Sequence, residues 1–162
     1  MLEKMIVKTY TAKDLQKKAI RKELESIICG DNKKYIAMYN VDSDNPLDDF
    51  LKQAEKLGKK DEMTISHCKA SSIDDTKPED SIAAVRDASY YGRNIGEDYP
   101  LVCSVPNEDK GSIDIIFSDV HPKTGELGRD LAYNASYYRK ECLICTENGD
   151  GTFELVPRQS RK

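Results

Sequence analysis

Two turn-rich segments, residues 107–111 and residues 148–151, constrain most strongly how this chain can fold. Each segment lies between two short apolar runs, and the second reads Asn-Gly-Asp-Gly, a combination typical of tight β-hairpin turns. Strands joined by so short a connection pair antiparallel. The C-terminal half is therefore predicted to hold two β-hairpins, one formed by residues 101–106 with 112–120 and one by residues 142–147 with 152–157.

The N-terminal half alternates between runs typical of strands and runs with helical spacing. Runs rich in β-branched and aromatic residues predict strands at residues 5–10, 35–41 and 63–69. Apolar residues spaced three and four apart, with capping residues before them and glycines after them, predict helices at residues 12–29, 46–57, 76–92 and 127–138. The expected fold class is α+β, with four helices layered on a mixed, largely antiparallel sheet that carries two C-terminal hairpins.

Length and composition indicate one domain in a reducing compartment. A chain of 162 residues is of ordinary single-domain size, so residues 1–157 are expected to form one α+β globular domain and residues 158–162 a flexible tail. No apolar stretch approaches the roughly 20 residues of a membrane span, and the start does not resemble a secretory signal. Five cysteines in this setting are expected to stay reduced. The expected location is cytoplasmic, although such a start also fits export without a cleaved signal peptide.

Tyrosine is the unusual component of the composition. The chain has nine tyrosines, three phenylalanines and no tryptophan, and the string Ala-Ser-Tyr-Tyr occurs at residues 88–91 and again at 135–138. The repeat indicates either a duplicated helix-plus-hairpin unit or two tyrosine pairs that simply pack at helix ends. If the pairs are exposed together, they form a protein-binding surface, because tyrosine supplies large contact area at low entropic cost. The predicted binding residues are Tyr90, Tyr91, Arg93, Tyr137, Tyr138 and Arg139.

The composition therefore favours a protein-binding or regulatory module without catalytic chemistry of its own, such as an accessory or bacterial effector-like protein, whose partner is another protein. The alternative is a small cysteine- or carboxylate-dependent hydrolase or transferase. Its candidate catalytic residues are Cys103 as nucleophile, His121 as base and Asp119 as orienting acid. Cys103 lies on the first strand of the predicted hairpin, and Asp119 and His121 lie at the end of the second strand. The simpler interpretation makes Cys103 a core residue and His121 a turn residue before Pro122.

Metal, cofactor and nucleic-acid sites are not expected. Cys142 and Cys145 have the spacing of zinc ligands, but they lie within an apolar strand and have no second ligand pair nearby. The acids of residues 42–49 lack the glycine and the distal acid of a calcium loop and are typical of helix capping. No glycine-rich phosphate fingerprint is present. A net charge of −4 makes nucleic-acid binding improbable, despite a basic stripe of Lys13, Lys17 and Arg21.

A last pattern concerns acids near the second half of the chain. Asp114 lies inside an apolar run, and Asp119, Glu126 and Asp130 follow it at short intervals. Such a set could supply paired carboxylates for acid–base chemistry. An alternating strand that exposes Asp114 is the simpler explanation.

Overall fold

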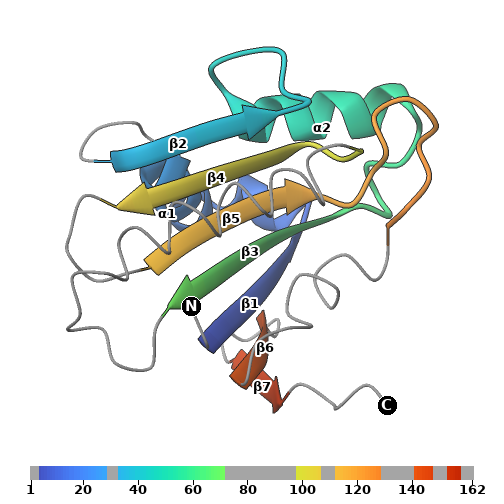
Figure 1. Cartoon of the computed structure of the whole chain (residues 1–162). Coiled ribbons are helices and arrows are strands. Elements are labelled where there is room, and N and C mark those ends of the chain that lie inside the picture. Colours follow the sequence, from blue (N-terminus) through green and yellow to red (C-terminus); the bar gives the residue numbers. More distant parts are fainter. Residues whose placement is uncertain are drawn as a thin grey trace.

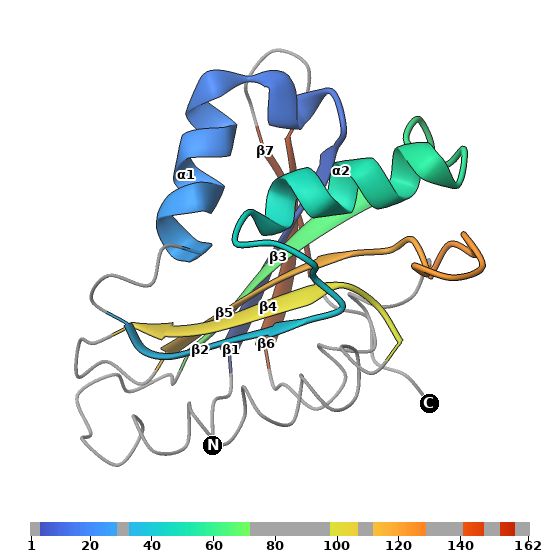
Figure 2. The ribbon, with the colours of Figure 1, turned by 90° about the horizontal axis from the view of Figure 1, so that it is seen from above.

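The structure, a computed structural model, describes residues 4–28, 33–71, 98–106, 112–128, 141–147 and 153–157. Within these ranges the chain forms a seven-stranded sheet with two α-helices on one face (Figures 1 and 2). The strands are β1 (Lys4–Thr11), β2 (Lys33–Tyr39), β3 (Thr64–Ser71), β4 (Leu101–Pro106), β5 (Ser112–Ser118), β6 (Glu141–Glu147) and β7 (Phe153–Pro157). These bounds confirm the positions of the seven predicted strands, within two residues at each end.

The sheet is mixed, with strand order β2-β4-β5-β3-β1-β6-β7. The five strands from β2 to β1 pair antiparallel throughout. The parallel pairing of β1 with β6 joins this part to the antiparallel pair of β6 and β7. Among the described strands, β2 and β7 therefore form the two edges of the sheet.

The predicted arrangement of four helices on a sheet with two C-terminal hairpins is wrong. The described residues contain two α-helices, α1 (Lys18–Ile28) and α2 (Pro46–Lys56). The strands β4 and β5 do not belong to a C-terminal unit, since they lie inside the five-stranded antiparallel part, between β2 and β3. A turn signal identifies which two strands follow each other, but it does not specify the strands that pair on their outer sides.

The two remaining predicted helices find no support in the described residues. Residues 76–92 and residues 129–138 lie outside the described ranges. The predicted start of the fourth helix is wrong, because Leu127 forms an antiparallel bridge with Val120 and is not helical. The predicted tail, residues 158–162, also lies outside the described residues.

The first predicted helix, residues 12–29, is interrupted. Thr11 and Asp14 form the predicted capping box, in which each backbone N–H donates to the other side chain at 2.8 and 3.3 Å. The turn that follows is a short 3₁₀ helix, η1 (Asp14–Gln16), and Lys17 is extended with a ψ of 119°. The α-helix begins only at Lys18, so the two segments can pack Leu15 and Leu24 into the same core from different directions.

The second predicted helix is confirmed as α2, whose signals at both ends operate as expected. The side chain of Asn45 accepts a hydrogen bond from the Asp48 backbone N–H, and Pro46 occupies the first turn. The helix ends before Gly58, whose φ of 70° lies in the left-handed region that favours glycine. Neither described helix, each 11 residues long, has the length and apolar character needed to cross a membrane.

Both faces of the sheet are apolar near its centre. Tyr10, Ile65, Val102 and Ile116 point towards the helices and pack with their buried side chains, namely Leu24, Ile28, Leu47, Phe50 and Ala54. Because side chains alternate along a strand, the intervening residues lie on the opposite face. These are also buried and include Val7, Cys68, Leu101, Cys103, Val105, Ile113, Ile115 and Phe117.

Candidate functional site

A groove of about 480 Å³ lies beside the edge strand β2, where α1 ends and α2 begins. Its lining is mainly apolar, with Glu25, Asp44 and Asn45 as polar members and Ile28, Ile36, Met38, Pro46 and Leu47 as the apolar ones. Met38 is 40% exposed and is the only large hydrophobic side chain exposed among the residues whose burial is described. We call this hollow the β2 groove. It combines an apolar lining with a strand that has no described neighbour on its outer side.

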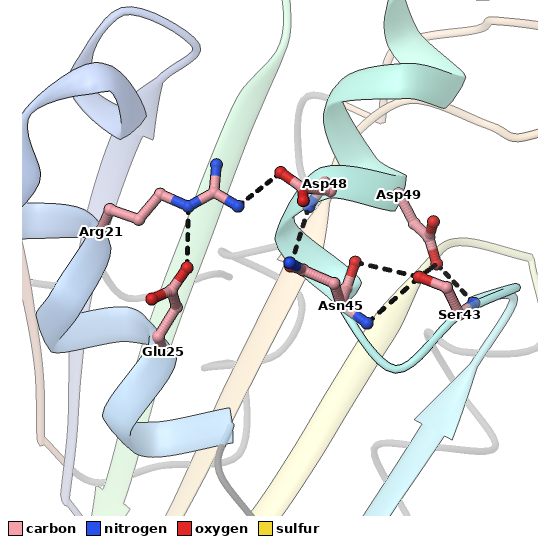
Figure 3. A network of polar contacts seen from close by, with 6 residues as sticks. All are labelled: Arg21, Glu25, Ser43, Asn45, Asp48 and Asp49. Carbon is pink, nitrogen blue, oxygen red and sulfur yellow. Dashed lines mark hydrogen bonds and ion pairs between the residues drawn. The ribbon is translucent and has the colours of Figure 1, made fainter.

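An arginine clamp fixes the distance between the two helices that border the β2 groove. Figure 3 shows the guanidinium of Arg21 between two carboxylates: Nε donates to Oε1 of Glu25 at 2.9 Å, and Nη2 donates to Oδ1 of Asp48. The hydrogen bond with Glu25, followed by the interactions with Asp48, outweighs partial burial and raises the pKa of Arg21. Because Glu25 also lines the groove, the clamp holds a negative charge at its wall.

The loop between β2 and α2 is organised around one buried carboxylate. Oδ2 of Asp49 accepts a hydrogen bond from the backbone N–H of Asp42 at 3.0 Å. It also accepts from the backbone N–H of Ser43 at 2.8 Å and from Oγ of Ser43 at 2.9 Å (Figure 3). The Asn45 N–H donates in turn to Oγ of Ser43 at 3.1 Å. These bonds hold the loop that carries Asp44 and Asn45 at the groove, and they give Asp49, in the first turn of α2, a structural role.

A second hollow, also about 480 Å³, lies between α2, the residues after β2 and the turn after β5. We call it the lysine pocket because Lys52, Lys56 and Lys123 line it, together with Asn40, Asp42, Asp49, Gln53, Leu57 and Pro122. The three lysines are exposed, and none forms an ion pair within the described part of the chain. Elsewhere on the surface, Lys59 and Lys60 do pair with acids, Glu62 and Glu55.

Gln53 lines the lysine pocket and has one buried acceptor. Its Nε2 donates to the backbone oxygen of Asn40 at 3.1 Å, which fixes the amide plane. Its Oε1 is buried and has no hydrogen-bond partner in the described structure. Asn40 itself has a φ of 55°, a conformation that asparagine tolerates better than most residues. A buried amide oxygen without a partner costs free energy, and this atom is closed off from the hollow as the side chain stands.

Cys103, the predicted nucleophile, is fully buried at the centre of β4. It pairs with Ala37 and Ile115 and alternates with Val102, so it lies on the face of the sheet opposite the helices. Burial raises the pKa of the Cys103 thiol to about 12, which leaves it protonated at neutral pH. A protonated thiol in an apolar layer is a poor nucleophile.

His121 and Asp119, the other two predicted catalytic residues, lie beyond the end of β5. Nδ1 of His121 accepts from the backbone N–H groups of Lys123 and Thr124 at 3.2 and 3.3 Å, and its ring meets the Tyr99 ring edge-on with centroids 5.6 Å apart. The Asp119 carboxylate accepts from the N–H and Oγ1 of Thr64. Ile115, the residue of β5 that pairs with Cys103, lies three residues, about 10 Å, before the end of β5. The structure therefore does not align the three side chains as a triad.

The simpler sequence interpretation places Asp114 on an exposed strand face, and this is wrong. Asp114 is 9% exposed, and its Oδ1 lies 2.8 Å from Nε2 of the buried His67 on the neighbouring strand. Ser104, directly across from Asp114 on β4, is fully buried, and its Oγ has no hydrogen-bond partner in the described structure. Ser104 on β4, Asp114 on β5 and His67 on β3 follow one another across the sheet, so Ser104 and His67 lie on strands that are not neighbours.

The predicted tyrosine and arginine surface cannot be placed. Tyr90, Tyr91, Arg93, Tyr137, Tyr138 and Arg139 all lie outside the described residues, as do the repeated strings that contain them. The basic stripe of the first helix is described, and it is partly neutralised because Arg21 binds two acids and Lys17 lies 3.6 Å from Asp14. The described residues also contain no group of three or more metal-binding side chains that could hold an ion.

Sequence reasoning missed the residues that line the two hollows. Met38 lies in a run predicted as a strand, but the pattern of that run does not show that the strand is at the edge of the sheet. Lys52 and Lys56 lie four apart on α2, a spacing that could have indicated a one-sided basic surface. Lys123, from a turn far away in the sequence, carries no signal that would connect it to them.

Comparisons with known proteins do not add to this geometry. No protein-family model matches the sequence, no curated protein does, and no solved structure does either.

Proposed function

We propose that this chain is a protein-binding module and that the β2 groove receives an extended segment of its partner. Among the described residues, β2 is an edge strand, Met38 is the one exposed large hydrophobic side chain, and an apolar groove lies beside both; this coincidence supports the proposal. An extended peptide can add to an edge strand through main-chain hydrogen bonds while its alternate side chains enter a neighbouring hollow.

The lining of the groove indicates the chemistry of the bound segment. Ile36 and Met38 offer an apolar surface to a side chain that points into the groove, and the buried Ile28 and Leu47 lie beneath it. Glu25 and Asp44 place two carboxylates beside it, and none of the described lysines and arginines lines the groove. The expected partner is therefore an extended segment with an apolar residue next to a lysine or arginine, because opposite charges at the rim favour encounter and register.

The groove is held in shape before a partner arrives. The Arg21 clamp connects the two helices at its border, and the hydrogen bonds to Asp49 fix the loop that carries Asp44. A preformed site loses less conformational entropy on binding than a site that must first be ordered. The predicted tyrosine surface remains a separate prediction for the same function.

The experiment is a selection of peptides from a random library on the whole chain, followed by affinity measurement with synthetic peptides and the variant Met38→Glu. A charged side chain in the apolar groove is expected to weaken the selected peptides by at least about 10-fold. Thr124→Glu, on an exposed turn away from the groove, adds the same charge and is expected to leave the affinity unchanged. Equal affinity for the wild type and Met38→Glu would refute the proposal.

The charge preference is tested with a second variant, Asp44→Asn, which leaves the Arg21 clamp intact. It should reduce the advantage of peptides that carry lysine or arginine, while peptides with a neutral residue there should bind as before. A selection that yields only acidic peptides, or none, would contradict the proposed partner chemistry.

A further inference from the structure

From the lysine pocket we infer a second binding site, for a small phosphate-bearing molecule. This site is distinct from the β2 groove. It is formed by the stripe of α2 that contains Lys52, Gln53 and Lys56, by the residues that follow β2, and by the turn at Lys123.

The size of the lysine pocket suits a small ligand. A volume of about 480 Å³ falls within the range of small-molecule sites, roughly 300–1,000 Å³. Its three walls come from residues 40–42, 49–57 and 122–123, segments that the fold brings together from distant parts of the sequence. A ligand would therefore bridge α2 and the turn after β5.

The positive charge of the pocket is available to a ligand. Lys52, Lys56 and Lys123 have no ion pair in the described structure, whereas Lys59 and Lys60, just after α2, are paired with Glu62 and Glu55. Lysine binds phosphate as a point charge with three donors, and ammonium groups from two elements can contact different oxygens of one phosphate.

Two acids in the lining favour a small anion over a long polyanion as the ligand. The carboxylate of Asp49 already accepts three hydrogen bonds from the loop through its Oδ2, so it is engaged there. Asp42 is exposed at the pocket and would repel a continuous chain of phosphates. Three lysines and these two acids leave a small positive excess, which suits a single phosphate group better than a nucleic acid strand.

The experiment compares ribose 5-phosphate with inorganic phosphate as probes of the whole chain. Backbone amide shifts in two-dimensional NMR locate the site, and calorimetry gives the affinity. We expect both probes to shift the amides of residues 52–57 and 122–124, because the phosphate group is common to them. An absence of shifts at roughly 20 mM ribose 5-phosphate, well above the ~1 mM Kd expected of a weak small-molecule site, would overturn the inference.

Two double variants separate a specific site from a general charge effect. Lys56→Gln with Lys123→Gln removes two positive charges from the pocket and should weaken ribose 5-phosphate by about 10-fold. Lys59→Gln with Lys60→Gln removes the same charge from outside it and should change the affinity less than about 2-fold. Equal weakening by both pairs would show non-specific attraction only and would overturn the inference.

The Met38→Glu variant should bind ribose 5-phosphate normally, so failure of the peptide proposal and failure of this one are distinguishable.

Discussion

Two buried serines on adjacent strands are expected to respond to the same substitution with opposite signs. Ser104 on β4 and Ser118 on β5 are 0% and 1% exposed. The Oγ of Ser118 accepts a hydrogen bond from the backbone N–H of Val120 at 3.2 Å, while the Oγ of Ser104 has no partner in the described structure. Removing each hydroxyl therefore tests whether a buried polar atom stabilises the fold only when it is paired.

The magnitudes follow from the cost of burying an unpaired polar group. Ser104→Ala removes an unpaired hydroxyl whose burial costs about 1–3 kcal/mol. The small cavity that it leaves costs a few tenths of a kcal/mol, so the free energy of unfolding is expected to rise by about 1 kcal/mol. Ser118→Ala leaves the buried N–H of Val120 without an acceptor and should cost about 1–3 kcal/mol. At about 2–4 °C per kcal/mol for a chain of this size, the two Tm values should differ by roughly 4–16 °C.

The assay is thermal and urea unfolding of both variants beside the wild type, followed by circular dichroism. Equal urea m-values in all three proteins are required, since a changed slope would mean that the denatured state has changed too. Destabilisation of Ser104→Ala by more than about 1 kcal/mol would refute the reasoning. It would show that the Ser104 hydroxyl does donate a hydrogen bond, and the residue directly across the strand pair is Asp114.

Three further outcomes are expected. Asp49→Ala removes the acceptor of three hydrogen bonds and should lower the free energy of unfolding by about 2–4 kcal/mol in urea titrations. Asp44 is exposed in the loop that Asp49 holds, so Asp44→Ala should change this free energy by less than about 0.5 kcal/mol. Arg21→Met should cost only about 1 kcal/mol in the same assay, because the ion pairs that it breaks are partly exposed; a loss above about 3 kcal/mol would contradict this. For Cys103, burial raises the pKa of the thiol to about 12 from its ordinary value of 9.0, so the unfolded thiol ionises at lower pH than the folded one, and stability should decline as the pH rises above 9. Mass-spectrometric mapping of thiol labelling at pH 8 should find Cys103 unreacted in the native state; rapid labelling would restore it as a candidate nucleophile.

Local signals in the sequence explain which parts of the fold could be predicted. The helix α2 has a capping asparagine, a proline in its first turn and a glycine after its last turn, and each acts at the position where the sequence places it. The first helix has an equally good capping box, but the box caps a 3₁₀ turn, because Lys17 is extended and the chain changes direction before α1. A cap specifies where a helical turn begins, and tertiary packing decides how far it continues.

Strand order and the candidate sites depend on contacts that are distant in the sequence. The run at residues 33–39 has the same strand character whether it lies at an edge or in the centre, so the exposure of Met38 was not predictable. The buried pairing of His67 with Asp114 arises from the pairing of β3 with β5, which no turn connects. An aspartate within an apolar run had indicated an exposed strand face only because its partner could not be identified.

The loop between β2 and α2 connects the two proposed sites physically. Asp42 lines the lysine pocket and Asp44 lines the β2 groove, so two residues of one short loop border different hollows. Asp49 binds this loop through Asp42 and Ser43, and it also lines the lysine pocket. A ligand that shifts the balance of hydrogen bonds at Asp49 would thus act on the wall of the β2 groove. Because binding free energies are reciprocal, a peptide in the groove would change the affinity of the lysine pocket by the same factor.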